Sequence, residues 1–70
     1  MKPFNLEEVR ANAPFEVFFH HVGWVAGKLK HVSKHDCNTT EVKVSFDDLR
    51  VVDTEWFVLP NDRLRMKEET

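Results

Sequence analysis

The segment Glu41-Val42-Lys43-Val44-Ser45-Phe46 decides the fold class of this chain. In it Val42, Val44 and Phe46 alternate with polar residues. Because successive side chains of a β-strand point to opposite faces, this alternation predicts a strand with one buried face and one exposed face.

Further strand patterns lie on both sides of this segment. The predicted strands cover residues 15–19, 25–32, 42–46, 51–59 with a turn at 53–54, and 64–66. Gly23 and Gly27 are the only glycines, and each predicts a sharp bend, a bulge or a close backbone approach. Five or so strongly bent strands predict a small, partly open barrel of the SH3-like or Sm-like kind.

A short helix is predicted ahead of the strands, over about residues 5–13. Asn5 can cap the first turn, and Glu8 follows three residues later to complete a capping box. Phe4 and Val9 stand at the positions of a hydrophobic staple. We expect this helix to cover one end of the core.

Length and composition limit the class of protein. The chain has 70 residues, 41% of them apolar, and reads as one domain, 1–70, with a barrel over about residues 15–66 and a charged tail at 67–70. A domain of this size leaves little structure for a buried catalytic cavity, which favours a binding module over an enzyme. No apolar run approaches the ~20 residues of a membrane span, and no signal-like segment follows Met1. An intracellular location, cytoplasmic or nuclear, is therefore expected, with no membrane partner.

Several short motifs resemble those of Tudor and Agenet domains. They are Gly-Trp-Val-Ala-Gly-Lys-Leu at 23–29, Val-Lys-Val-Ser-Phe-Asp-Asp-Leu at 42–49, Glu-Trp-Phe-Val at 55–58 and Arg-Leu-Arg at 63–65. The resemblance implies a mainly β fold: a small five-stranded SH3-like, Tudor-like barrel preceded by one short N-terminal α-helix. It also implies a reader module, in which aromatic rings surround a methylated lysine or arginine and hold the cation over their faces.

Carried onto this chain, the resemblance implies a ligand site of three aromatic residues and one acid: Trp24, Phe46, Trp56 and Asp48. Val25 stands where an aromatic residue usually completes the cage, and the chain contains no Tyr.

Two pairs of adjacent aromatic residues predict an interaction surface. Phe18 and Phe19 must point to opposite faces of a strand, as must Trp56 and Phe57. One member of each pair therefore lies outside the barrel interior. An exposed pair would mark a surface for a partner or for self-association.

Metal and cofactor sites are not predicted. His31, His35, Asp36 and Cys37 lie close together, but only His20-His21 offers a second pair of ligands. We interpret these residues as solvated loop positions and expect no metal, no cofactor and no catalytic residue. The single cysteine cannot close an intrachain disulfide.

A basic edge favours an alternative function, the binding of nucleic acid. It consists of Lys28, Lys30, Lys34 and Lys43, and residues 28–43 carry a charge of +2 against −3 for residues 44–70. Such an edge can meet a nucleic-acid backbone or an acidic partner. However, the net charge of −2 is far from the basic footprint of a dedicated nucleic-acid binder.

Three functions follow from these patterns. The main hypothesis is a non-enzymatic module that recognises a protein or peptide through aromatic surface near Trp24 and Trp56, with Asp47 and Asp48 favouring a cationic ligand. The first alternative is a small barrel protein, of the kind phages and bacteria encode, that forms homo-oligomers or inhibits a partner protein. The second alternative is a nucleic-acid-binding Sm-like barrel that uses the basic edge.

Overall fold

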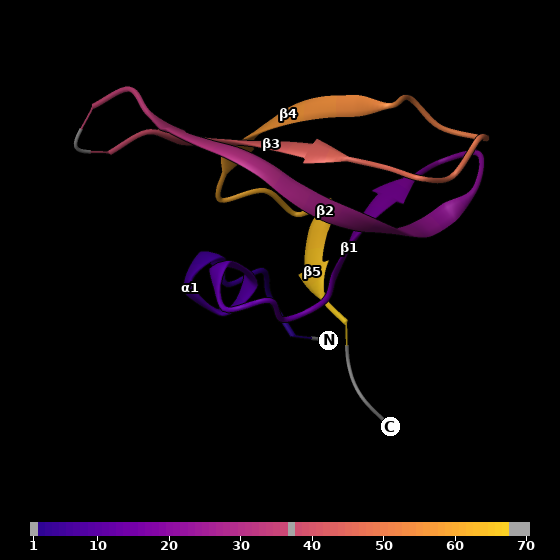
Figure 1. The fold of residues 1–70 in the computed structure, drawn as a ribbon, viewed down its shortest axis with the longest axis horizontal. Coiled ribbons are helices and arrows are strands. Elements are labelled where there is room, and N and C mark those ends of the chain that lie inside the picture. Colours follow the sequence, from indigo (N-terminus) through magenta and orange to yellow (C-terminus); the bar gives the residue numbers. More distant parts are fainter. Residues whose placement is uncertain (1, 37, 68–70) are drawn as a thin grey trace.

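The computed structural model describes residues 2–36 and 38–67, which form a short helix and five antiparallel strands in one sheet (Figure 1). The elements are α1 (Leu6–Arg10), β1 (Phe15–Phe19), β2 (Gly23–Lys34), β3 (Thr40–Ser45), β4 (Thr54–Leu59) and β5 (Leu64–Met66). The strand order is β4-β3-β2-β1-β5, so β4 and β5 are the two edges. The predicted mainly β class is confirmed, but the sheet is not closed into a barrel. In the described part of the chain, no helix has the length and apolar character needed to cross a membrane.

Strand β2 connects the two halves of the sheet. Its first half pairs with β1, and its second half, from Lys28 on, pairs with β3. At the junction, a Cβ on Gly27 would lie 2.6 Å from Cγ1 of Val44 and 3.1 Å from Cε2 of Phe15. A Cβ does not fit here unless these neighbours shift. The predicted close approach therefore occurs at Gly27, and it is made by the side chains of Val44 and Phe15. A bulge between Leu29 and His31 marks a further irregularity in the ladder.

The core lies on the inner face of the bent sheet, where each strand contributes alternate residues. The buried hydrophobic side chains are Val9, Phe15, Val17, Phe19, Val25, Val42, Val44, Phe46, Phe57, Leu64 and Met66. Phe19 and Phe57 are buried, whereas Phe18 is half-buried and Trp56 is exposed. The prediction that one aromatic residue of each adjacent pair lies outside the interior is therefore confirmed.

Helix α1 covers one end of this core through Val9. The predicted cap forms, because the Asn5 side chain accepts a hydrogen bond from the Glu8 backbone N–H at 3.2 Å. The second half of the predicted capping box does not form: the Glu8 carboxylate pairs with Lys2 at 2.8 Å instead. The helix ends at Arg10, earlier than predicted, and the chain turns away at Asn12, whose φ of 72° is left-handed.

The fourth strand starts later than predicted. Val51 and Val52 lie in the loop between β3 and β4, and β4 begins only at Thr54. In this loop the Asp48 carboxylate accepts hydrogen bonds from the Arg50 backbone N–H at 2.9 Å and from its guanidinium at 2.7 Å. This local turn takes the backbone out of strand geometry. The tight turn predicted before β5 is present, with the Leu64 N–H bonded to the Asn61 carbonyl at 3.1 Å.

Candidate functional site

Arg63, the residue before β5, connects β4, one edge of the open sheet, to β1. Its Nε donates to the Phe18 carbonyl at 3.1 Å and its guanidinium pairs with Glu55 of β4 at 2.9 Å. The guanidinium carbon also lies 5.2 Å from the ring centroids of both Phe19 and Phe57. Arg63 therefore links β4 to β1 across the gap between the two edge strands. In a closed barrel, these two strands would pair and the gap would be absent. We call this gap between β4 and β5 the seam.

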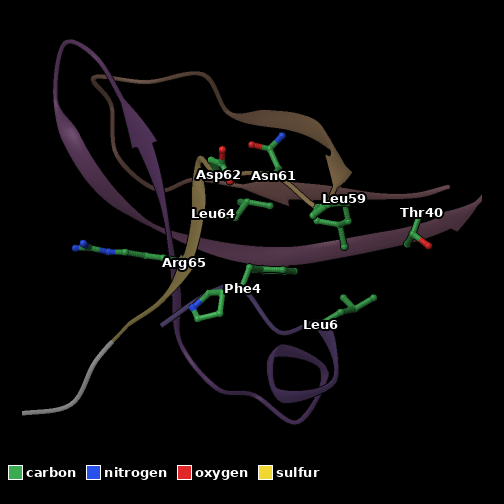
Figure 2. Close-up of a pocket in the computed structure, with 10 residues that line it drawn as sticks. Phe4, Leu6, Thr40, Leu59, Asn61, Asp62, Leu64 and Arg65 are labelled. Atoms are coloured by element: carbon green, nitrogen blue, oxygen red, sulfur yellow. The ribbon is translucent and has the colours of Figure 1, made fainter. Parts of the chain in front are cut away.

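The seam contains a pocket of about 480 Å³. Its lining is mainly apolar and comes from two distant parts of the chain, residues 3–6 and residues 59–65, together with Thr40. Figure 2 shows Phe4 and Leu6 on one side, opposite Leu59 and Leu64 on the other. Pro3 and Pro60 add to the apolar lining, and Asn61, Asp62 and Arg65 supply polar groups. We call this space the seam pocket.

The N-terminal wall of the seam pocket is fixed by contacts with β5. The Met66 N–H donates to the Lys2 carbonyl at 3.0 Å, and Pro3 forms an isolated bridge with Arg65. The Phe4 ring meets Phe15 edge to face, with ring centroids 5.3 Å apart. Backbone and core contacts thus hold Phe4 in place, so this wall is preformed.

The free charge at the seam pocket is negative. Arg65 is compensated: it pairs with Glu16 at 3.0 Å, and its guanidinium carbon lies 3.9 Å from the ring centroid of Trp24. The Asp62 side chain is exposed and makes no hydrogen bond or ion pair with any residue in 2–36 or 38–67. Asp62 therefore gives the pocket an uncompensated carboxylate.

The two tryptophans of the predicted ligand site lie on the outer face of the sheet. Trp24 contacts Phe18, with centroids 5.4 Å apart, and already carries the guanidinium of Arg65 on its ring. Trp56 is 45% exposed and meets His31 edge to face at 5.9 Å. The two indoles therefore have different neighbours, with Phe18 and Arg65 beside Trp24 and His31 beside Trp56.

The other two residues of the predicted site have partners elsewhere. Phe46 is buried and packs edge to face on Phe19, with centroids 5.1 Å apart. Asp48 lies in the loop between β3 and β4, where hydrogen bonds from the side chain and backbone of Arg50 lower its pKa to about 2. The structure therefore does not gather Trp24, Phe46, Asp48 and Trp56 around one point.

The basic edge is spread over several environments. Lys28 pairs with Asp47 at 3.1 Å, and Lys30 lies at the bulge of β2. Lys34 stands opposite Thr40 at the far end of the hairpin, and Lys43 stands opposite Trp56.

The cluster of potential metal ligands is similarly dispersed. Within residues 2–36 and 38–67, no group of three or more His, Cys, Asp and Glu side chains is placed to hold a metal ion. Cys37 lies outside the described residues. His35 pairs with the carboxylate of Glu41 across the β2–β3 hairpin.

The seam pocket is not apparent from the sequence. The local patterns place Phe4 in the helix staple and Leu59 and Leu64 in strands, and nothing in these patterns relates the three residues. A scan of protein-family models, curated proteins and solved structures finds no match to the chain. The fold and the site thus define a small mainly β protein with an open seam and a preformed apolar pocket.

Proposed function

We propose that this protein is a non-enzymatic binding module that recognises a short segment of a partner protein or peptide. The seam pocket carries the proposal. Its volume of about 480 Å³ and its mainly apolar walls fit a ligand side chain the size of Leu or larger. Burial of such a side chain contributes roughly 1.5–3 kcal/mol.

The charge at the pocket supports a ligand of defined chemistry. The uncompensated Asp62 carboxylate favours a Lys or Arg next to the apolar residue of the ligand. An exposed ion pair of this kind contributes roughly 0.2–1 kcal/mol. The sequence also predicts a cationic ligand. Here Asp62, not Asp48, receives the cation, because Asp48 is already bound by Arg50.

Binding can be measured with three capped hexapeptides. The first contains Leu followed by Lys in an otherwise Ser and Gly sequence; the second has Ala in place of Leu, and the third has Glu in place of Lys. NMR titration should shift the methyl signals of Leu6 and Leu59 with the first peptide and leave them unchanged with the second. The third peptide should bind more weakly than the first.

Two variants distinguish the pocket from nonspecific binding. Leu6→Trp fills the pocket and should abolish binding, whereas Leu49→Trp, at a loop residue that is 99% exposed, should not change it. Asp62→Asn should weaken the Leu-Lys peptide up to about fivefold and leave the Leu-Glu peptide no weaker. Equal shifts with all three peptides, or no shift with any, would contradict the proposal.

A further inference from the structure

One wall of the seam pocket is the turn between β4 and β5, and Asn61 closes this turn. The Asn61 carbonyl accepts the Leu64 N–H at 3.1 Å, and its Oδ1 accepts the Arg63 N–H at 3.0 Å. Asn61 and Leu64 both line the pocket. Hydrogen bonds within the turn set its shape, but they cannot fix its distance from the opposite wall at Phe4.

Arg63 ties this turn to β1. The register of β1 with β5 ends at Val17 and Leu64, so the next pair along would be Phe18 and Arg63. The Phe18 N–H donates to the Arg63 carbonyl at 2.8 Å, as in a strand pair. Because the Arg63 N–H is already bonded to Asn61, Nε of Arg63 takes its place and donates to the Phe18 carbonyl at 3.1 Å. The side chain thus completes a pair that the backbone alone leaves half made.

The guanidinium of Arg63 extends the tie to β4. It pairs with Glu55 at 2.9 Å, and its carbon lies 5.2 Å from the ring centroids of Phe19 in β1 and Phe57 in β4. The described residues that line the pocket do not include Arg63. Arg63 therefore acts on a ligand in the pocket only through the turn that it holds.

We propose, on the basis of the peptide binding proposed for this pocket, that Arg63 is its positioning residue. It holds the turn between β4 and β5 at the distance from Phe4 that admits a ligand side chain. Loss of the Arg63 contacts frees the turn, so that the pocket is formed in only a fraction of the molecules. The apparent Kd rises in proportion as that fraction falls.

The sign of the effect separates positioning from charge. Arg63 directly follows Asp62, so its cation repels a Lys of the ligand that approaches the same carboxylate. Arg63→Gln removes this repulsion, and a role through charge alone predicts tighter binding of the Leu-Lys peptide. Positioning predicts weaker binding in spite of the lost charge.

NMR titration of three variants with the Leu-Lys peptide tests the proposal. Arg63→Gln should weaken binding about tenfold. Arg63→Lys keeps the charge but replaces the planar fork that reaches both Phe18 and Glu55 with a single amine, so its Kd should lie between those of Arg63→Gln and the unchanged chain. Arg50→Gln is the matched control. It removes the same charge and a contact with Asp48 outside the pocket lining, and should leave Kd within about twofold. A far-ultraviolet circular dichroism spectrum establishes that each variant is folded.

Amide hydrogen exchange gives a second readout. Phe18 is not among the described residues that line the pocket, yet its N–H is bonded to Arg63. If the formed pocket and the Arg63 contacts favour each other, ligand binding must stabilise those contacts. Saturation with the Leu-Lys peptide should therefore slow exchange of the Phe18 amide in the unchanged chain, and should slow it much less in Arg63→Gln.

The outcomes separate the role of Arg63 from peptide binding itself. If the unchanged chain binds none of the peptides, both proposals are contradicted. If the unchanged chain binds and Arg63→Gln binds equally or more tightly, the role of Arg63 alone is overturned. A Phe18 amide whose exchange does not respond to the peptide would also overturn it. So would equal weakening in Arg50→Gln, because the loss would then follow from reduced stability and not from the pocket wall.

Discussion

Replacement of Gly27 by Ala tests the packing of Val44 and Phe15 against the backbone of β2. The added Cβ would lie 2.6 Å from Cγ1 of Val44, whose side chain is fully buried at 0% exposure, and 3.1 Å from Cε2 of the buried Phe15. Neither side chain can move out to solvent, so the neighbouring strands must shift. Overpacking of this kind typically costs 1–3 kcal/mol, and we expect about 2 kcal/mol. For a domain stabilised by roughly 3–5 kcal/mol, this is about half of the total.

The assay is urea unfolding followed by circular dichroism. Gly27→Ala should lower the midpoint without changing the slope m, and should lower Tm by roughly 8–16 °C. Val44→Ala removes the atom that the new Cβ meets, so the double variant should lose less stability than the sum of the two single variants. Gly23→Ala is the control. Its φ of 100° strains any side chain, but nothing lies within 4 Å of the new Cβ, so Val44→Ala should not rescue it.

Two results would contradict this role of Gly27. One is a Gly27→Ala protein that unfolds at the same urea concentration as the unchanged chain. The other is a double variant in which the losses from Gly27→Ala and Val44→Ala add to within about 0.5 kcal/mol, because contact between the two positions would then be absent.

Three further predictions concern single contacts. The pKa of Asp48 is lowered from 3.8 to about 2, chiefly by the Arg50 side chain; the resulting stabilisation is complete above about pH 4 and is lost as pH falls towards 2. Arg50→Gln should return that pKa towards its ordinary value in a carboxyl NMR titration, and an unchanged pKa would contradict the assignment. Asn5→Ala removes the cap of α1 and should cost about 1 kcal/mol in urea unfolding, whereas no loss would show that the cap is dispensable. Arg63→Met keeps the apolar stem but loses the bonds across the seam; we expect a loss of about 1–2 kcal/mol, and an unaltered Tm would show that the seam closes without them.

Local patterns predicted the elements of the fold where neighbouring residues determine structure. The alternation of Val42, Val44 and Phe46 correctly indicated one buried face of β3, and Asn5 correctly marked the start of α1. The start of β4 was misplaced because the Asp48–Arg50 contact keeps the following residues in a turn. Whether the sheet closes depends on contacts between its two edges, which no single segment encodes.

The candidate site was harder to predict because its parts are far apart in the chain. Phe4 and Leu64 line one pocket only because Pro3 pairs with Arg65 and the turn after β4 brings Leu59 near the N-terminal segment. The Gly-Trp motif and the aromatic residue type point to Trp24 as a ligand residue, yet its ring already carries the guanidinium of Arg65, which follows it by 41 residues. Parity along a strand, in contrast, correctly separated Trp56 from Phe57 because it is a local property.

Intermolecular nuclear Overhauser effects provide the most direct test of the seam pocket. With the Leu-Lys peptide in excess, its leucine methyl groups should show effects to the Phe4 ring and to the methyl groups of Leu59. These two residues line opposite sides of the pocket (Figure 2). Effects to the indole of Trp24 or Trp56 in their place, or a peptide that binds without any effect to Phe4 and Leu59, would contradict the assignment of the seam pocket as the ligand site.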